Sequence, residues 1–404
     1  MQLKNKNIVI VGLQSWDVEI GSNCKNIAVE FAKHNKVLYV NYALDIITKY
    51  KEKQDPRVQK RIRIARNQEK NLVQVENNIW NLYPKNVLYS INWIKNNTIF
   101  DWLNFRNNRE FAADILAGVQ TLGFNDFILF NDNDIFRSLY LKQILNPRLY
   151  MYYIRDYVVA VEYWKHHGMR LEPRIMKSAD VVTANSTYLA NYAAGHNKQS
   201  YYVGQGCDFS LFDNVEGKAI PSDIGGIKKP TIGYVGALNS IRLDKELLEK
   251  LAVQKPEWHF VYVGPEDHQF KQSSLHSCKN VHFLGNKDVA ELPAYIQAFD
   301  VCINPQKVNE VTIGNYPRKI DEYLALGKPT VATKTDAMSI FSEYVYQAES
   351  GDEYIPLIQK ALNESDTVIR EKRKLFALGH TWEQSVSDIY EAMYKVDPKL
   401  FDEE

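Results

Sequence analysis

Short apolar segments that alternate with amphipathic helical segments constrain the fold more than any other feature of this sequence. Each apolar segment ends in glycine or polar residues, which is typical of buried parallel strands followed by loops. The alternation stops near residue 213 and restarts at residue 231. The expected strands are residues 8–12, 37–41, 126–130, 148–154, 180–184, 231–236, 259–264, 281–285, 301–305 and 329–333. This pattern predicts an α/β chain with two open parallel sheets covered by helices.

Residues 213–229, which are rich in glycine, proline and charge, mark the predicted boundary between two domains. A chain of 404 residues has room for two Rossmann-like sheets. The expected parts are a first domain at residues 1–215, a linker at 216–229, a second domain at 230–380, and a C-terminal helix at 381–404 that packs back onto the first domain. Ligands of such sheets bind at the carboxyl ends of the strands, so we expect the two domains to face a central cleft.

Composition excludes several classes of protein. Hydrophobic residues make up 45% of the chain and charged residues 24%, which excludes a disordered or fibrous protein. The four cysteines have no metal-ligand spacing, so we expect reduced thiols. No apolar run has the length of a signal peptide or a membrane-spanning helix. We therefore expect a cytoplasmic protein.

The segment with the clearest chemistry is residues 304–331, where a predicted strand leads into a polar loop and then a helix. Pro317 suits the start of that helix, because its missing N–H is not needed there. The free N–H groups and the helix dipole favour a diphosphate, and Lys319 adds positive charge in the first turn. Glu322 follows about one turn later, where its carboxylate can accept both hydroxyls of a ribose. The alternative is a surface ion pair between Lys319 and Glu322.

The stretch Glu322-Tyr-Leu-Ala-Leu-Gly327-Lys-Pro329-Thr-Val resembles a signature of family 4 glycosyltransferases, which have the GT-B fold. Residues 315–323 are most similar to the branch that includes the teichuronic-acid and xanthan-type polysaccharide glycosyltransferases. Further stretches resemble other family motifs in the same order, namely residues 206–212, 232–236, 280–285, 292–295 and 299–301. The resemblance covers most of the chain and is most specific at residues 231–333.

The resemblance implies a donor site for a nucleotide diphosphate sugar in the second domain. Glu322 would bind the ribose, and cations and loop residues would hold the pyrophosphate. The donor-binding residues expected on this basis are Glu322, Lys319, Arg242, Lys307, Thr312, Gly314, Asn315 and Gly236. No cofactor is expected besides this substrate, which we expect to be a UDP-sugar.

This sequence departs from the family pattern at two places. The arginine that the family usually has after the first strand of the donor domain is Ala237, while Arg242 stands at the position of the family's lysine. Gly314 stands where the family often has the first of two glutamates. One phosphate-binding cation is therefore missing, and we expect Lys307 to substitute for it.

On the acceptor side, Asp156 follows the strand at residues 148–154 and is expected at the edge of the sheet. Its surroundings resemble those of an Asp that activates the acceptor hydroxyl in the xanthan-type relatives. A carboxylate acts as a general base only within hydrogen-bond reach of that hydroxyl. The alternatives are a helix N-cap and a partner for Arg155.

The loop at residues 14–23 follows the first strand and is expected to face the same ligand. Trp16 either stacks on a sugar ring or packs in the core. Ser22, Asn23 and Asp132 are the other expected acceptor contacts.

Asp132 and Asp134 have the spacing of the metal-binding Asp-x-Asp of another nucleotide-sugar fold, GT-A. That interpretation requires the nucleotide in the first half of the chain, whereas the predicted phosphate loop lies in the second. We therefore expect no metal site, and we expect these aspartates to face the acceptor or to cap the next helix.

Charge is unevenly distributed, although the net charge is zero. Residues 1–215 carry 27 Lys and Arg against 20 Asp and Glu, and residues 216–404 carry 22 against 29. Within the first half, a basic segment at residues 49–70 precedes an aromatic one at residues 87–105. Such a pair can lie on an anionic membrane or beside a lipid-linked substrate, or it can be a solvated helix beside ordinary core. The basic segment is too short to favour nucleic acid.

These observations predict a metal-independent glycosyltransferase that moves a sugar from a UDP-sugar to a saccharide or lipid-linked acceptor in surface polysaccharide biosynthesis. We expect it to be cytoplasmic, and peripheral contact with the cytoplasmic face of the inner membrane stays open as an alternative. The family 4 resemblance implies retention at the anomeric carbon and the Asp156 resemblance implies inversion, and we favour retention. The alternatives are a UDP-sugar 2-epimerase of the same fold and a non-catalytic nucleotide-sugar binding protein.

Overall fold

The computed structural model describes residues 1–18, 22–212, 215 and 219–402. Their contacts divide the chain into unit 1, Met1–Gly204 with Trp382–Glu404, and unit 2, Gln205–Thr381. Residues 205–212, which we expected in the first domain, belong to unit 2. The reason is local, because the N–H of Cys207 donates to the carbonyl of His380 at 2.8 Å and Phe209 lies in the core of unit 2. Residues 216–218 of the expected linker lie outside the described residues.

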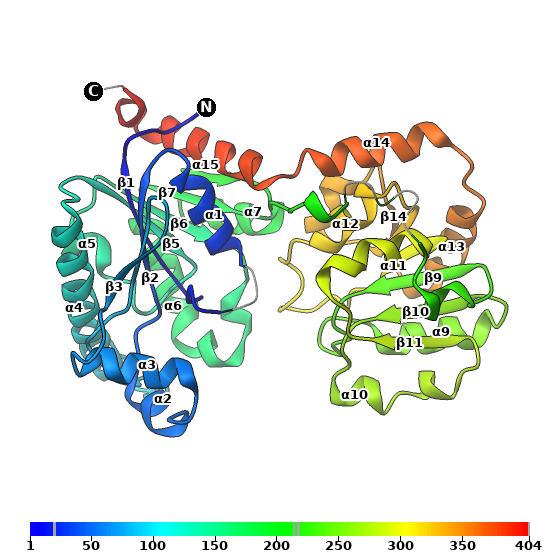
Figure 1. Cartoon of the computed structure of the whole chain (residues 1–404), viewed down its shortest axis with the longest axis horizontal. Helices are drawn as coiled ribbons and strands as arrows, with labels where there is room; N and C mark the ends of the chain where they lie inside the picture. Colours follow the sequence, from blue (N-terminus) through cyan, green and yellow to red (C-terminus); the bar gives the residue numbers. More distant parts are fainter. Residues whose placement is uncertain (19–21, 213–214, 216–218, 403–404) are drawn as a thin grey trace. The chain divides into compact units, whose positions relative to one another are not determined.

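Unit 1 is built on an eight-stranded sheet with the order β3-β4-β2-β1-β5-β6-β7-β8 (Figure 1). Its strands are β1 (Asn7–Gly12), β2 (Lys36–Val40), β3 (Leu72–Glu76), β4 (Ile79–Leu82), β5 (Phe127–Asp132), β6 (Leu149–Ile154), β7 (Val181–Ala184) and β8 (Ser200–Tyr202). All neighbours pair in parallel except β3 and β4, which form an antiparallel hairpin. The sequence analysis missed this hairpin, because β3 is largely exposed and lacks an apolar run.

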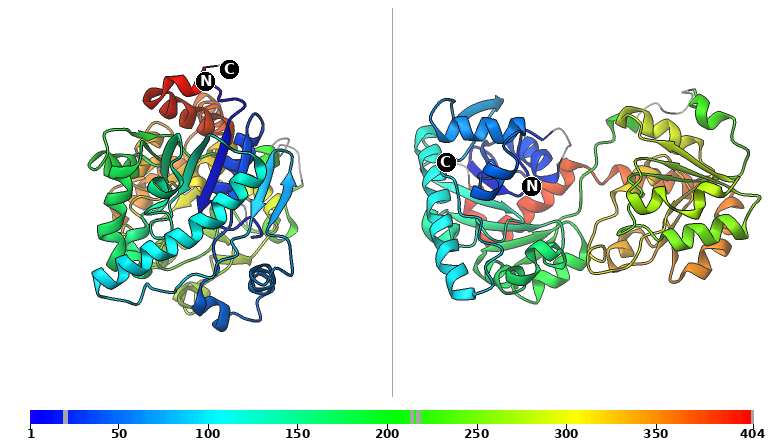
Figure 2. Two further views of the ribbon diagram at one scale, coloured as in Figure 1. Left: turned by 90° about the vertical axis from the view of Figure 1, so that its left-hand side faces the viewer. Right: turned by 90° about the horizontal axis from the view of Figure 1, so that it is seen from below.

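Helices cover both faces of this sheet (Figures 1 and 2). One face packs against α1 (Asn23–Ala32) and the C-terminal α15 (Trp382–Val396), whose Phe31 and Tyr390 rings stack at 5.5 Å. The other face packs against the long α4 (Asn97–Leu122), α5 (Leu141–Leu145), α6 (Glu162–Ser178) and α7 (Thr187–Ala194). Two basic helices, α2 (Ile46–Lys51) and α3 (Pro56–Ala65), follow β2. Successive residues of β1 alternate between the two cores, as a buried parallel strand requires.

Unit 2 is built on a six-stranded, wholly parallel sheet with the order β11-β10-β9-β12-β13-β14. Its strands are β9 (Thr231–Val235), β10 (His259–Val263), β11 (Val281–Gly285), β12 (Val301–Asn304), β13 (Thr330–Thr333) and β14 (Tyr346–Ala348). Its helices are α8 (Ser222–Gly225), α9 (Lys245–Gln254), α10 (His268–Lys271), α11 (Leu292–Ala298), α12 (Arg318–Ala325), α13 (Tyr354–Leu362) and α14 (Thr367–Leu378). The expected α/β class with two Rossmann-like sheets is confirmed.

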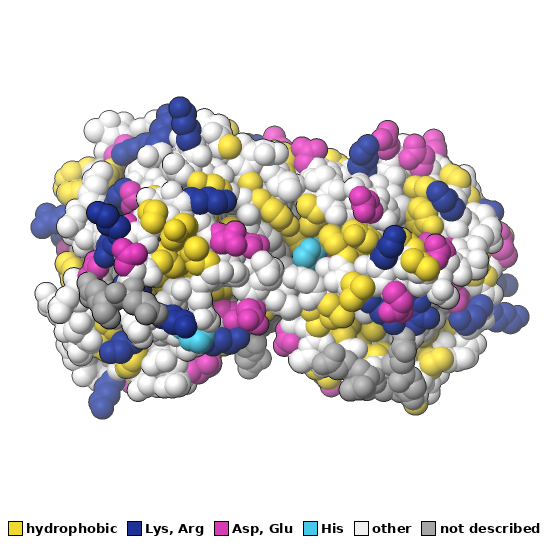
Figure 3. All heavy atoms as spheres, turned by 90° about the horizontal axis from the view of Figure 1, so that it is seen from above, with side chains coloured by type: hydrophobic (Ala, Val, Ile, Leu, Met, Phe, Trp, Pro, Cys, Tyr) yellow, Lys and Arg dark blue, Asp and Glu magenta, His cyan; other side chains and the backbone are white. Residues whose placement is uncertain are grey.

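The surface carries charges of both signs. On the face drawn in Figure 3, basic and acidic side chains are interspersed over each unit, without a continuous patch of one sign. Among the residues that the structure describes, no helix has both the length and the apolarity needed to cross a bilayer.

Candidate functional site

Helix α12 of unit 2 carries two of the expected donor-binding side chains, and buried polar contacts hold it in place. The hydroxyl of Tyr323 accepts the N–H of Val235 at 3.0 Å, which ties the helix to the end of β9. The fully buried Asp321 accepts the Tyr316 hydroxyl at 2.7 Å, and its other oxygen lies 2.6 Å from Nδ1 of His380. Burial raises the pKa of Asp321, and the contacts with His380 and Tyr316 oppose that rise. The helix is therefore fixed at the carboxyl edge of the sheet.

Lys319 of α12 passes directly over the backbone of Gly236, which follows β9. A Cβ built on Gly236 would lie 2.2 Å from Cε of Lys319, and Gly236 has a φ of +136°, so glycine is needed there for two reasons. The ammonium lies 5.5 Å from the centre of the Tyr234 ring. The structure thus brings together two expected donor residues that are far apart in sequence.

Glu322 lies one turn after Lys319, and its Oε1 is 3.3 Å from Nε of Arg318. The ion pair that we considered as an alternative therefore forms with Arg318 rather than with Lys319. Burial raises the pKa of Glu322, while the positive charges of Arg318 and Lys319 oppose the rise. If the hydroxyls of a ribose took the place of Arg318, they would donate to the Glu322 carboxylate. This carboxylate is partly shielded from water, and hydrogen bonds are stronger in such surroundings.

The loop between β12 and α12 brings two more expected cations together. The N–H of Lys307 donates to the carbonyl of Arg242 at 2.8 Å, and both side chains are exposed. Thr312 is buried, and its hydroxyl accepts the N–H of Asn309 at 3.1 Å and contacts the carbonyl of Lys307. Gly314 is buried in this loop, and the N–H of Asn315 donates to the Thr312 carbonyl at 3.0 Å. The Thr312 hydroxyl therefore shapes the loop.

Sequence reasoning missed Asp267, which organises the loop that carries Arg242. Its Oδ2 accepts both the N–H and the hydroxyl of Ser240, each at 2.7 Å, and its own N–H donates to Leu238 at 3.0 Å. Its other oxygen caps α10 through the N–H of Phe270. Burial alone would raise the pKa of Asp267, but these hydrogen bonds outweigh it and lower the pKa. An Asp before a helix predicts a cap, but only the fold pairs it with Ser240.

In unit 1, Asp132 and Asp156 meet at the carboxyl edge through Arg155. Nε of Arg155 lies 3.0 Å from the fully buried Asp132, and Nη1 lies 3.1 Å from Asp156, whose side chain is 44% exposed. The amide oxygen of Asn133 accepts the N–H groups of both Arg155 and Asp156. Asp156 thus has the partner that we considered as an alternative and still reaches solvent. Because Asp132 is buried against Arg155, we now assign it to positioning this group rather than to acceptor contact.

The Asp-x-Asp pair has other partners. Oδ1 of Asp134 accepts the N–H groups of Phe136 and Arg137 at 3.1 and 3.0 Å, so this side chain caps the turn that follows β5. Burial raises the pKa of Asp132 and of Asp134. Within the described part of the chain, no three His, Cys, Asp or Glu side chains are arranged to hold a metal ion.

Trp16 and Ser22, which we expected near the acceptor, pack against or cap neighbouring elements. Trp16 packs edge-on against Tyr39 with ring centres 5.2 Å apart, which is the packing alternative. The buried Ser22 caps α1 by accepting the N–H of Lys25 at 3.2 Å, which corrects its assignment to acceptor contact. Asn23 is the first residue of α1. Residues 19–21 of this loop lie outside the described residues.

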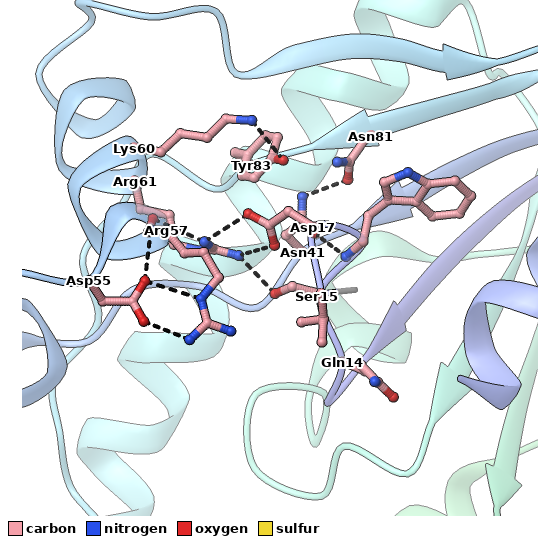
Figure 4. Close-up of polar contacts among 12 residues, drawn as sticks. Gln14, Ser15, Asp17, Asn41, Asp55, Arg57, Lys60, Arg61, Asn81 and Tyr83 are labelled. Carbon is pink, nitrogen blue, oxygen red and sulfur yellow. Dashed lines mark hydrogen bonds and ion pairs between the residues drawn. The ribbon is translucent and has the colours of Figure 1, made fainter. Parts of the chain in front are cut away.

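Figure 4 shows how the start of this loop is held. Arg61 of α3 pairs with both oxygens of Asp17 at 3.0 and 3.1 Å and donates to the Ser15 hydroxyl at 2.8 Å. The N–H of Trp16 donates to Asn41 at 2.8 Å, and Asn41 donates to Asn81. Arg61 is buried, so this member of the basic segment is an internal anchor rather than a solvated charge. Its position in a basic run gave no signal of that role.

Part of the chain is similar in sequence to known proteins. Residues 229–361 match the family model of glycosyl transferases group 1. The teichuronic acid biosynthesis glycosyltransferase TuaH of Bacillus subtilis (strain 168), a curated protein, is 31% identical over 225 residues, which are 52% of this chain and 56% of that protein. The chain thus spans about half the length of the curated relative that it matches.

Solved structures resemble nearly the whole chain. Alr3699/HepE of Anabaena in complex with UDP and glucose has a TM-score of 0.62 at 16% identity, over 96% of this chain and 99% of its own. Sucrose-phosphate synthase of Thermosynechococcus elongatus has a TM-score of 0.65 at 14% identity, over 98% of this chain and 100% of its own. At these identities the likeness establishes the GT-B fold. The family match at residues 229–361, the curated relative and the shared fold therefore agree with the family that the sequence motifs resemble.

Proposed function

We propose that this chain transfers a sugar from a UDP-sugar to a saccharide or lipid-linked acceptor in surface polysaccharide biosynthesis. The observation that carries the proposal is Lys319 lying over Gly236, with Glu322 one turn later on the same anchored helix. This arrangement offers a cation for a diphosphate and a carboxylate for a ribose. UDP is favoured as the nucleotide because a structural neighbour binds UDP and glucose, and the named role of TuaH favours polysaccharide synthesis.

The proposed chemistry rests on stabilising the leaving diphosphate. Lys319, Arg242 and Lys307 would neutralise the charge that develops on it, together with the N–H groups at the start of α12. We propose that no metal takes part, because Asp132 is paired with Arg155 and Asp134 caps a turn. These cations would supply the positive charge that a metal provides in other transferases.

On the acceptor side, Asp156 is the proposed partner of the attacking hydroxyl. It is half-exposed, and Arg155 and Asn133 hold it at the carboxyl edge of unit 1. We favour retention of configuration, in line with the family 4 resemblance. The anomeric proton coupling in the NMR spectrum of the product distinguishes retention from inversion.

Helices α2 and α3 support peripheral contact with an anionic membrane. Ile46, Ile47 and Tyr50 of α2 are exposed apolar side chains beside Lys49 and the exposed Lys51. Exposed apolar groups flanked by Lys and Arg favour an anionic lipid surface. Co-flotation with phosphatidylglycerol vesicles, but not with phosphatidylcholine vesicles, is the expected result.

Thermal unfolding with and without UDP, GDP and a chelator tests the donor site. UDP at about 100 times its Kd should stabilise the wild type by about 2.7 kcal/mol, with or without chelator. Glu322→Ala should lose this stabilisation, whereas Glu371→Ala, which removes a largely exposed carboxylate of α14, should keep it.

No stabilisation by any nucleotide would contradict the proposed donor site. If UDP binds, UDP release from UDP-sugars without any acceptor would instead indicate an epimerase. A nucleotide-binding protein that turns over no UDP-sugar with any acceptor would be non-catalytic.

A further inference from the structure

A cavity of about 400 Å³ lies at the carboxyl edge of the sheet of unit 1. Its walls come from segments far apart in sequence, among them Leu13 after β1, Tyr42 after β2 and Asp134 after β5. Leu13 directly follows Gly12, and Asp134 lies two residues after Asp132. The cavity therefore lies beside the proposed Asp156 group. Among its lining residues, the sequence analysis considered Asp134 and the aromatic segment at residues 87–105 but did not place them in one site.

Six of the lining residues are aromatic. The rings that line the cavity are those of Tyr42, Tyr89, Trp93, Phe136, Tyr163 and Trp164. Trp93 is 72% exposed and Tyr163 is 54% exposed, so these two side chains remain accessible to a ligand. Flat apolar surfaces of this kind pack against the C–H face of a sugar ring while its hydroxyls point elsewhere.

Aliphatic side chains (Leu13, Ile47, Leu88 and Ile91) and several polar groups complete the wall. Asp45 accepts hydrogen bonds from Thr48 and Ser90, which outweigh the effect of burial and hold the pKa of Asp45 below its usual value, so its carboxylate is charged. The guanidinium of Arg137 lies 3.1 Å from the centre of the Tyr42 ring. Asn104 is only 1% exposed, and its Nδ2 has no hydrogen-bond partner among the described residues.

These polar groups distinguish between two possible occupants. A hydrocarbon chain would leave the Asn104 amide unpaired and would remove water from Asp45 and Arg137 without offering them a new hydrogen bond. A sugar hydroxyl can both donate and accept, so it can pair with all three groups. The wall therefore favours a saccharide over an isoprenoid tail.

The cavity is preorganised by hydrogen bonds within its own walls. The side chain of Asn107 accepts the N–H of Tyr89 and donates to the Tyr89 carbonyl, each at 2.9 Å. Nε1 of Trp93 donates to the Ser90 carbonyl at 2.8 Å. The amide of Asn92 donates to the carbonyl of Tyr163. The Trp93 ring and the backbone at Tyr89 and Tyr163 are held in this way, so they lose little freedom when a ligand binds.

We propose that this cavity binds a pyranose ring of the acceptor, between the faces of Trp93 and Tyr163 and the polar groups Asp45, Asn104 and Arg137. The inference rests on the proposed function, because it assigns the acceptor side of the same reaction. The acceptor would then be a saccharide whose sugar ring contacts the cavity wall directly.

Saturation-transfer NMR without nucleotide tests this assignment. The probes are methyl glycosides of glucose, N-acetylglucosamine and glucuronic acid, and farnesyl phosphate serves as a short isoprenyl probe. At least one glycoside should bind the wild type, and Trp93→Ala and Tyr163→Ala should each weaken its binding by about tenfold, as loss of a packed aromatic contact does. Trp102→Ala is the matched control, because Trp102 is a 63% exposed ring outside the cavity, and it should leave binding unchanged.

Three results would overturn the assignment. They are the absence of binding by every glycoside, glycoside binding that survives both cavity variants, and farnesyl phosphate binding that both cavity variants abolish. UDP stabilisation of Trp93→Ala is measured in parallel. Since the glycoside assay contains no nucleotide, failure of the donor site and failure of this cavity give separate results.

Discussion

The carboxyl edges of the two sheets use charge in opposite ways. In unit 2, the side chains of Lys307 and Arg242 are exposed, and Glu322 pairs with Arg318, four residues before it. The charges of these side chains are therefore available to a ligand. In unit 1, Asp132 and Arg61 are buried and paired with side chains from distant segments, so their charge holds loops in place. Unit 2 therefore offers exposed cations to a ligand, whereas unit 1 offers aromatic surface, the half-exposed Asp156, and the polar groups Asp45, Asn104 and Arg137 of the cavity wall. This division suits a charged donor and a largely uncharged acceptor.

The largest expected effect comes from breaking a buried pair in unit 1. Arg155→Met removes the partner of Asp132, which is fully buried. An uncompensated buried carboxylate should lower the free energy of unfolding by about 3–5 kcal/mol, measured by urea denaturation. A loss below about 1 kcal/mol would mean that Asp132 is neutral or finds another partner.

A second buried carboxylate of unit 1 should make stability depend on pH. Burial raises the pKa of Glu172 from 4.5 to about 7, although the hydroxyls of Tyr152 and Tyr192 donate to it. The folded state therefore holds this proton more tightly than the unfolded state, and stability falls as pH rises from 4.5 to 7. Glu172→Gln cannot ionise, so its stability relative to wild type should improve by about 3 kcal/mol between pH 4.5 and pH 8. Denaturation midpoints at several pH values measure this, and parallel curves for the two proteins would contradict it.

Asp156→Asn tests the half-exposed carboxylate of unit 1. If Asp156 contacts the reacting hydroxyl, sugar transfer should fall by about 100-fold or more. UDP stabilisation should not change, because the proposed donor residues lie in unit 2. The readouts are initial transfer rates and thermal shifts on the same preparation. Unchanged turnover would remove Asp156 from the mechanism.

Gly236→Ala tests the close approach in unit 2. The added methyl meets Cε of Lys319 at a backbone φ of +136°, so stability should fall by about 1–2 kcal/mol. Displacement of the ammonium should weaken UDP binding about tenfold, or about 1.4 kcal/mol, in a calorimetric titration. Gly226→Ala is the matched control, because its φ is −89° and a Cβ there meets no atom within 4 Å. Equal behaviour of the two variants would contradict the role of Gly236.

The smallest change in stability is expected when the solvent-exposed member of the Arg318–Glu322 ion pair of unit 2 is removed. Arg318 is more than half exposed, and it pairs with Glu322 at i, i+4. Arg318→Ala should change stability by no more than about 0.5 kcal/mol, in contrast to Arg155→Met. A loss as large as that of Arg155→Met would show that the two edges do not differ in their use of charge.

The sequence alone indicates that the proposed donor residues of unit 2 lie close together, whereas it does not do so for the proposed acceptor residues of unit 1. Lys307, Lys319 and Glu322 lie within one loop and helix, so their spacing alone places them together. Ser22 was expected to contact the acceptor but caps α1, and Trp16 was left open between stacking on a sugar and packing in the core. In the sequence, a capping serine or a packed tryptophan cannot be distinguished from one that contacts a ligand. The aromatic cavity was missed because its wall combines segments after β1, β2 and β5 with the loop before α4.

The sequence by itself determined the two alternating α/β halves, the glycine at the end of β9 and the loop–helix that carries Lys319 and Glu322. These features depend on apolar periodicity and local spacing, which are written along the chain. Only the tertiary structure decided that Asp132 is buried under Arg155, that Arg61 anchors the loop after β1, and that distant aromatic rings enclose one cavity. Burial and long-range pairing depend on which strands become neighbours, and the order of strands in a sheet is not the order in the sequence.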